Sequence, residues 1–184
     1  KMINIIDAPG YLDFIGQSMQ GIPAVESVGI VINAPSGIEP GARRMMEKAK
    51  DTNRCRFIIV NKIDSENANI KNLIQDIRKT FGNECLPVNL PADGGTRIVD
   101  CFFNSEGDSD LGPVAAAQKQ IIEQVVEVDE DLMTVYLDQG NVSPEQLHKA
   151  FQRALREGHV VPICFVCARQ HVNPEVAVGI KELL

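Results

Sequence analysis

The sequence predicts an α/β fold, in which a doubly wound, mostly parallel sheet carries an inserted α+β subdomain. Short apolar runs rich in β-branched residues recur in the first 60 residues, and segments with one apolar helical face lie between and after them. Continuous apolar runs are typical of parallel strands buried on both faces, and strand–helix alternation is typical of doubly wound sheets. The alternation stops after residue 82 and resumes near residue 160, which indicates an insertion.

Three apolar runs, residues 3–6, 28–32 and 57–60, are expected to form the strands of the sheet. Residues 40–50, between the second and third runs, place apolar side chains at helical spacing and polar ones on the remaining arc. The same spacing recurs in residues 70–77, after the third run. Both segments therefore predict amphipathic helices that cross between parallel strands.

The insertion is expected to begin with short strands and to end with helices. Residues 87–90 and 97–103 read as extended pieces separated by a turn that contains Pro and Gly. A long helical region is expected from residue 113 to about residue 137. The pattern Ser-Pro-Glu-Gln at residues 143–146 is typical of a helix start, because Ser at the N-cap and Gln three residues later form a capping box.

The chain is expected to divide into three parts. Residues 1–85 form a partial core domain, residues 86–158 form the inserted subdomain, and residues 159–184 return to the core domain. The returning part contains an apolar run, residues 160–166, which is expected to be the last strand. It ends in an expected helix at residues 174–184.

Composition excludes two classes of function. With 44% hydrophobic residues spread along 184 positions, no segment is apolar for long enough to cross a membrane. A formal charge of −7 argues against wrapping nucleic acid by bulk electrostatics, so we expect no sequence-specific nucleic-acid binding. The five cysteines are an odd number, which favours free thiols and a cytoplasmic location.

The most specific motif is Asn61-Lys62-Ile63-Asp64, directly after an expected strand. Ligands of open α/β sheets bind at the carboxyl ends of strands. Guanine offers an N1–H and a 2-amino group that the carboxylate of Asp64 can accept together, while Asn61 can bond the base edge and tie neighbouring loops. The methylenes of Lys62 can lie over the base. The alternative is a strand-to-helix turn in which Asp64 or Ser65 only caps the next helix.

A second motif, Asp7-Ala8-Pro9-Gly10, follows the first expected strand. A carboxylate there can hold Mg²⁺ through a water molecule, and Gly10 lets a backbone N–H approach a γ-phosphate closely. The alternative is a simple Pro-Gly turn.

With these two motifs, the sequence resembles the translational GTPases, most closely elongation factor G and its elongation factor G-like relatives. The segment similar to their switch II reads Ile3-Asn4-Ile5-Ile6-Asp7-Ala8-Pro9-Gly10-Tyr11-Leu12-Asp13-Phe14. The insertion is similar to the extra subdomain that elongation factor G carries in its G domain, including the stretches at residues 129–133 and 136–137. The resemblance covers nearly the whole chain and implies a sheet of the P-loop GTPase type.

The resemblance also implies a site and a function. It implies that Mg²⁺ with GTP or GDP is bound, with the metal held by Asp7 through water, and that hydrolysis drives ribosomal translocation in protein synthesis. The ribosome is the implied partner of the intact protein. In the family a Ser-Ala pair after the last strand contacts guanine, and Cys167-Ala168 stand at that place here, followed by Arg169.

Two departures from the family pattern affect the expected activity. The phosphate loop Gly-x-x-x-x-Gly-Lys-Ser/Thr and the N-terminal strand before it are absent, and Lys1 opens directly into an apolar run. We therefore expect the natural protein to begin earlier, and we expect these 184 residues alone neither to bind GTP tightly nor to hydrolyse it. Tyr11 stands where the family has its catalytic histidine, and a phenol with a pKa of about 10 cannot replace an imidazole near neutral pH.

Two rival interpretations remain open. One is a hydrolytically weak, ribosome-associated binding module with a GTPase fold. The other is an unrelated α/β enzyme that carries Asn-Lys-x-Asp by chance. A zinc half-site at Cys164 and Cys167 is disfavoured, because no second pair with ligand spacing exists and the two thiols fit a packed core.

Overall fold

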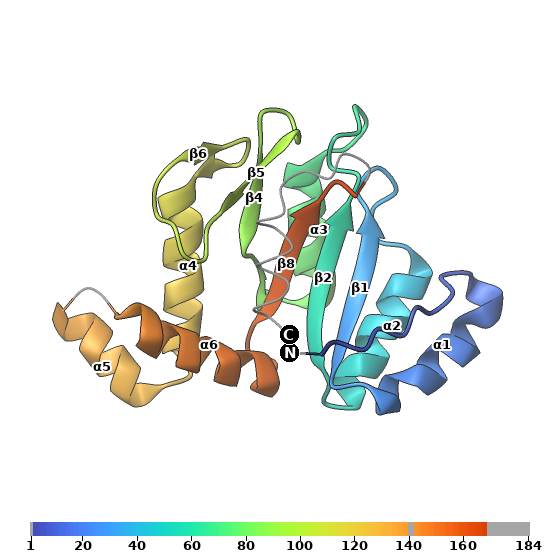
Figure 1. The fold of residues 1–184 in the computed structure, drawn as a ribbon, viewed down its shortest axis with the longest axis horizontal. Coiled ribbons are helices and arrows are strands. Elements are labelled where there is room, and N and C mark those ends of the chain that lie inside the picture. Colours follow the sequence, from blue (N-terminus) through green and yellow to red (C-terminus); the bar gives the residue numbers. More distant parts are fainter. Residues whose placement is uncertain (1, 140–141, 169–184) are drawn as a thin grey trace.

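The computed structural model describes residues 2–139 and 142–168. Its centre is a four-stranded sheet in the order β1-β2-β8-β3, and each neighbouring pair is parallel. The strands are β1 (Ser27–Asn33), β2 (Cys55–Asn61), β3 (Cys85–Pro87) and β8 (Val161–Val166). Figure 1 shows this sheet with helices beside it, so the α/β class with a mostly parallel sheet is confirmed.

Both expected crossover helices are present, as α2 (Pro40–Asp51) and α3 (Ile70–Phe81). They contact each other and the strands beside them. In β1 the residues that face this packing are buried, whereas Val31, which points the other way, is 62% exposed. The expectation that β1 is covered on both faces is therefore wrong for the described residues. Helices cover one face of this strand, and its burial alternates with a period of two.

The expected strand at residues 3–6 is not formed. Residues 2–10 have no regular secondary structure and are all exposed, with Ile5 85% and Met2 89% exposed. A strand needs a neighbour that completes its backbone hydrogen bonds, and within the described chain β1 is paired only with β2. The segment leads into three short helices, which are η1 (Leu12–Phe14), α1 (Ile15–Gly21) and η2 (Ile22–Ala24).

The insertion begins with two small hairpins. Strand β4 (Asn89–Ala92) pairs antiparallel with β5 (Arg97–Asp100), and β6 (Asp108–Ser109) pairs with β7 (Gly112–Pro113). The second extended piece is shorter than the expected 97–103. Its strand stops at Asp100, whose carboxylate accepts hydrogen bonds from the two backbone amides at residues 102 and 103, at 2.8 and 3.2 Å.

Three helices follow the hairpins. They are α4 (Val114–Val126), α5 (Glu130–Gln139) and α6 (Pro144–Glu157). The expected single helical region at 113–137 is therefore wrong, because Asp129 interrupts it. Its carboxylate accepts a hydrogen bond from the amide of Leu132 at 3.0 Å, which caps the start of α5. The capping box at residues 143–146 is confirmed.

The core consists of two apolar clusters that meet at β8. Ile163 and Phe165 belong to a cluster with β1, β2, α2 and α3, whereas Cys164 belongs to one with α4 and α6. Because successive side chains of a strand point to opposite faces, the inserted helices cover the face of β8 that α2 and α3 leave open. The divisions at residues 85/86 and 158/159 stay a prediction, and the expected helix at 174–184 lies outside the described residues. No helix in the described ranges is both long and apolar enough to span a membrane.

The inserted hairpin is joined to the sheet by a buried side chain, Asn89. Its Oδ1 accepts a hydrogen bond from the backbone N–H of Phe165 at 2.7 Å, and its Nδ2 donates to the carbonyl of Phe165 at 3.3 Å. Asn89 is only 7% exposed, so water cannot readily replace these bonds. Strand β3 pairs with β8 from Val161 to Ile163. Beyond that point, the side chain of Asn89 takes the place of a neighbouring strand and bonds the backbone of Phe165.

We expect Asn89→Ala to lower the free energy of unfolding by about 2–4 kcal/mol, because two buried backbone groups of Phe165 lose their partners. Urea unfolding measures the change. The matched control is Asn104→Ala in the exposed loop before β6, which should change the free energy by less than about 0.5 kcal/mol. A loss below about 1 kcal/mol for Asn89→Ala would show that the two hydrogen bonds between Asn89 and Phe165 contribute little to the free energy of unfolding.

Candidate functional site

Three strand ends meet at one edge of the sheet. In the parallel register Asn33 of β1 lies opposite Asn61 of β2, and Asn61 lies opposite Val166 of β8. The next residue after β1, Ala34, donates its backbone N–H to the carbonyl of Asn61 at 2.9 Å. The loops that follow these strands therefore start side by side, which is the arrangement that open α/β sheets use for ligand binding.

The side chain of Asn61 holds two of these loops together. Its Oδ1 accepts hydrogen bonds from the backbone N–H of Lys62 at 2.8 Å and from that of Ala168 at 3.1 Å. Ala168 is 107 residues away in sequence, so this contact is a tertiary one. The structure thus brings together Asn61 and the loop that contains Cys167 and Ala168, two parts of the site that the resemblance implies. Arg169 lies outside the described residues.

The Asn61–Asp64 loop has a defined shape. Lys62 has a left-handed backbone with φ of 63° and an exposed side chain, whereas Ile63 is 3% exposed and belongs to the main apolar cluster. Asp64 is half-buried. Burial of Ile63 anchors the loop, so that the polar residues on either side of it are held at the surface of the sheet edge.

The alternative role for this motif, a cap for the next helix, is wrong. The N-cap of α3 is Asn69, whose side chain accepts a hydrogen bond from the backbone N–H of Asn72 at 3.0 Å. Helix α3 begins at Ile70, six residues after Asp64. Neither Asp64 nor Ser65 caps it.

The Asp7–Gly10 segment has a different environment. Its four residues are exposed, and Ser18 of α1 donates a hydrogen bond from its hydroxyl to the carbonyl of Pro9 at 2.8 Å. Tyr11 is 78% exposed. In Figure 1 the described chain before α1, which includes this segment, runs from beside the lower end of the sheet to α1 on the right, whereas β2 ends at the top. Asp7 is thus not at a strand end, because the strand expected before it is not formed.

The buried cysteines are core thiols. Cys164 and Cys167 are 1% and 4% exposed, and within the described residues no group of three or more His, Cys, Asp or Glu side chains is placed to hold a metal ion. Burial raises the pKa of Cys164 to about 12, since the thiolate would lose its hydration. Burial and the nearby Glu84 raise the pKa of Cys85 to about 12 as well. These thiols remain protonated at physiological pH.

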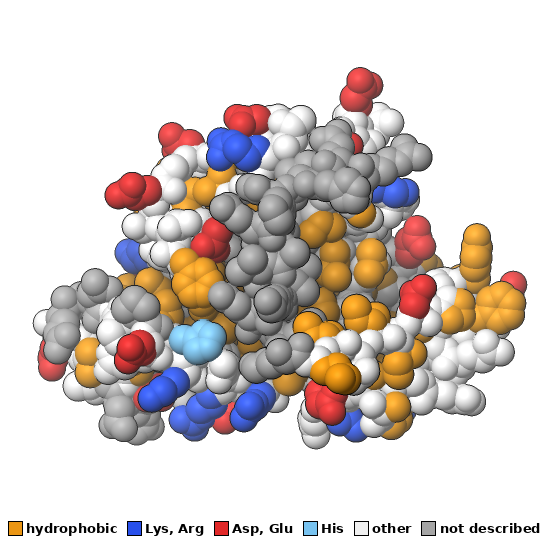
Figure 2. Space-filling model, viewed as in Figure 1, with side chains coloured by type: hydrophobic (Ala, Val, Ile, Leu, Met, Phe, Trp, Pro, Cys, Tyr) orange, Lys and Arg blue, Asp and Glu red, His pale blue; other side chains and the backbone are white. Residues whose placement is uncertain are grey.

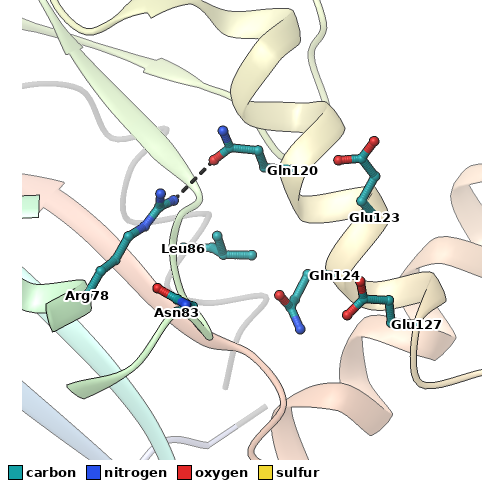
Figure 3. A pocket seen from close by; sticks show the side chains of 7 residues that line it. All are labelled: Arg78, Asn83, Leu86, Gln120, Glu123, Gln124 and Glu127. Atoms are coloured by element: carbon teal, nitrogen blue, oxygen red, sulfur yellow. Dashed lines mark hydrogen bonds between the residues drawn. The ribbon is translucent and has the colours of Figure 1, made fainter. Parts of the chain in front are cut away.

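A shallow groove lies elsewhere, between α3 and α4. Figure 3 shows the seven side chains that line it, which are Arg78, Asn83, Leu86, Gln120, Glu123, Gln124 and Glu127. Arg78 donates a hydrogen bond to Oε1 of Gln120 at 3.1 Å. This bond joins α3, a helix of the core domain, to α4, a helix of the insertion, so the groove lies at the interface between these two parts.

Sequence reasoning missed two residues that position this edge of the sheet. Asn89 holds Phe165, three residues before Ala168, and Gly95 lies against the Asn61–Asp64 loop. The Asp-Gly-Gly pattern at 93–95 signals a turn, but nothing in the sequence shows where that turn packs.

A parallel α/β sheet with an Asn-Lys-x-Asp loop at its carboxyl edge, joined by a hydrogen bond to the loop after the last strand, defines a domain of the GTPase class. The profile of the elongation factor Tu GTP binding domain family matches residues 1–184. The chain belongs to this family and is a translational GTPase domain.

Similar proteins support this assignment. The chain is 29% identical over 175 residues to an elongation factor G-like protein of Thermotoga maritima, covering 89% of this chain and 26% of that protein. It is 27% identical to elongation factor G of Fervidobacterium nodosum, covering 99% of this chain and 28% of that protein. A crystal structure of a Thermus thermophilus protein matches with a TM-score of 0.82 at 28% identity, over 97% of this chain and 29% of that one. The chain thus spans between a quarter and a third of these relatives.

We expect Cys55, which is half-buried, to react with iodoacetamide at pH 8 before the other thiols. The thiolate is the reactive form, and a pKa of about 12 leaves only about one in ten thousand Cys164 or Cys85 thiols ionised at that pH. Peptide mass spectrometry after timed quenching measures the order. Alkylation of Cys164 as fast as that of Cys55 would contradict the buried placement.

Proposed function

We propose that the intact protein binds GTP and GDP and couples GTP hydrolysis to ribosomal translocation in protein synthesis. The observation that carries this proposal is the hydrogen bond of 3.1 Å between the backbone of Ala168 and the side chain of Asn61. It sets the loop after β8 beside the Asn-Lys-x-Asp loop, as a site that surrounds a base from two sides requires. Family membership supports the same function.

Guanine selection falls to the residues at this edge. Asp64 accepts the N1–H and the 2-amino group of the base, and each charged hydrogen bond of this kind contributes about 1.5–3 kcal/mol. The exposed Lys62 lays its methylenes over the base. Asn61 holds the loop after β8 through the backbone N–H of Ala168, and this bond brings Cys167 and Ala168 to the edge where the base binds. Arg169 completes this set by its position after the pair.

The Asp7–Gly10 segment serves the phosphates and Mg²⁺. Its single exposed carboxylate suits Mg²⁺, which keeps several waters and takes one or two protein carboxylates beside the phosphate oxygens. The metal, when bound, neutralises charge on the transferring phosphoryl group. Asp7 would hold it through water, Ala8 and Pro9 would lie beside the phosphates, and Gly10 would donate its backbone N–H. This exposed segment, which Ser18 of α1 now holds at the carbonyl of Pro9, would reorder when a γ-phosphate is present.

The remaining assignments concern the partners of the intact protein. It binds the ribosome, as its similarity to elongation factors supports. All five cysteines are free, in keeping with a cytoplasmic location. The charge of −7 disfavours direct, sequence-specific binding of nucleic acid.

A second candidate function is a ribosome-associated binding module that hydrolyses GTP weakly. The specific observation in its favour is Tyr11, a phenol at the position where elongation factor G has the histidine that orients water. Phosphate release from GTP by the full-length protein, with and without ribosomes, separates the two candidates.

We expect Asp64→Asn to weaken GDP binding by about 10–100-fold and to improve binding of xanthosine diphosphate. Xanthine has a carbonyl where guanine has the 2-amino group, so an amide can donate where the carboxylate only accepts. Titration of the full-length protein with both nucleotides measures the exchange. Asp76→Asn on the exposed side of α3 is the control, and equal effects of the two substitutions would overturn the assignment.

We expect Tyr11→His to raise ribosome-stimulated GTP hydrolysis by at least about tenfold at about pH 7.5, because general acid–base catalysis by an imidazole typically contributes about 10²–10⁴-fold. Tyr11→Phe is the control and should leave the rate unchanged. Phosphate release in single-turnover reactions measures the rates. A histidine variant no faster than the wild type would remove Tyr11 from the hydrolytic machinery.

A further inference from the structure

The turn between β4 and β5 of the insertion packs directly on the Asn61–Asp64 loop. Gly95 in this turn is buried and lies against the backbone of the loop. A Cβ atom at Gly95 would lie 2.8 Å from the carbonyl carbon of Ile63 and 3.2 Å from the amide nitrogen of Asp64, with the carbonyl oxygen of Ile63 closer still. Carbon atoms not bonded to each other prefer about 3.5–4.0 Å, so only glycine fits here without displacing the loop.

The turn is itself held in place. Its three residues Asp93, Gly94 and Gly95 have φ values of 55°, 67° and 79°. The backbone N–H of Gly95 donates to the carbonyl of Ala92 at 3.1 Å and to Oδ2 of Asp110 at 3.2 Å. Asp110 is fixed in turn by its own N–H, which bonds to the carbonyl of Pro91 at 2.9 Å. Hydrogen bonds from both hairpins of the insertion therefore hold Gly95, the residue that contacts the Asn61–Asp64 loop, in place.

We propose that the β4–β5 turn, through Gly95, positions Ile63 and Asp64 for guanine recognition, so that the inserted subdomain sets the affinity and base selectivity of the nucleotide site. This proposal rests on the proposed function. Gly95 acts as a positioning residue, because it contacts the backbone of the loop. Displacement of the Asp64 carboxylate by about 1 Å is enough to misalign two hydrogen bonds whose geometry is fixed by the base.

The chain offers a matched control in the neighbouring residue. Gly94 has a similar left-handed φ, but a Cβ atom there would meet nothing within 4 Å. Gly94→Ala and Gly95→Ala thus introduce the same methyl group and comparable backbone strain into one turn. They differ in whether the methyl group meets the Asn61–Asp64 loop.

The test is the dissociation of a fluorescent GDP analogue from the full-length protein, together with the ratio of the affinities for GDP and inosine diphosphate, which lacks the 2-amino group. We expect Gly95→Ala to speed dissociation by about tenfold or more and to reduce the GDP preference, and Gly94→Ala to change both by less than about twofold. General destabilisation of the protein does not change the ratio of the two affinities.

Equal effects of the two alanines, or no effect of Gly95→Ala, would overturn the proposal while leaving the proposed function intact. A wild-type protein that does not prefer GDP would overturn both. If Gly95→Ala does not fold, Asp110→Ala replaces it, with exposed Asp108→Ala as its control. We expect Asp110→Ala to speed GDP dissociation about threefold by loosening the turn, and a rate equal to that of Asp108→Ala would overturn the proposal.

Discussion

One carboxamide oxygen, Oδ1 of Asn61, fixes the geometry on which the site depends. It binds the amide next to it and the amide of Ala168, which are brought together only because β2 and β8 run parallel side by side. Parallel pairing aligns the carboxyl ends of strands, so loops far apart in sequence start at one edge. Because Oδ1 of Asn61 accepts hydrogen bonds from both loops, it fixes the distance between the loop after β2 and the loop after β8.

The insertion takes part in the same edge, although it is separate from the core domain in sequence. Its helices cover one face of β8, and the Asn89 side chain pairs with the backbone of Phe165 near the end of that strand. Its β4–β5 turn lies against Ile63 and Asp64. Figure 2 shows apolar side chains at the place of β1 and β2 on one face of the molecule, where described helices leave part of the sheet uncovered. The edge with the Asn61–Asp64 loop is, by contrast, supported from β8 and from the insertion.

Local sequence patterns were enough to predict most elements. The apolar runs of β1, β2 and β8, the helical spacing of α2 and α3, and the capping box of α6 each depend on nearby residues, and each was confirmed. The failures have tertiary causes. Residues 3–6 have the composition of a strand but no neighbouring strand to pair with in the part of the chain that the structure describes. The break between α4 and α5 depends on the hydrogen bond that the carboxylate of Asp129 accepts from the backbone N–H of Leu132. Of the candidate site, the contiguous Asn-Lys-x-Asp motif predicts a loop directly after β2, and the structure has that loop there. The contacts of Asn89 and Gly95 could not be predicted, because they depend on the folding of distant segments.

The most direct test of guanine recognition by the Asn61–Asp64 loop is a titration of the full-length protein with GDP and with ADP. We expect GDP to bind at least about a hundredfold more tightly, because two charge-assisted hydrogen bonds to the Asp64 carboxylate are available to guanine and not to adenine. Equal affinities for GDP and ADP would contradict it, since the Asn61–Asp64 loop would then not read the base.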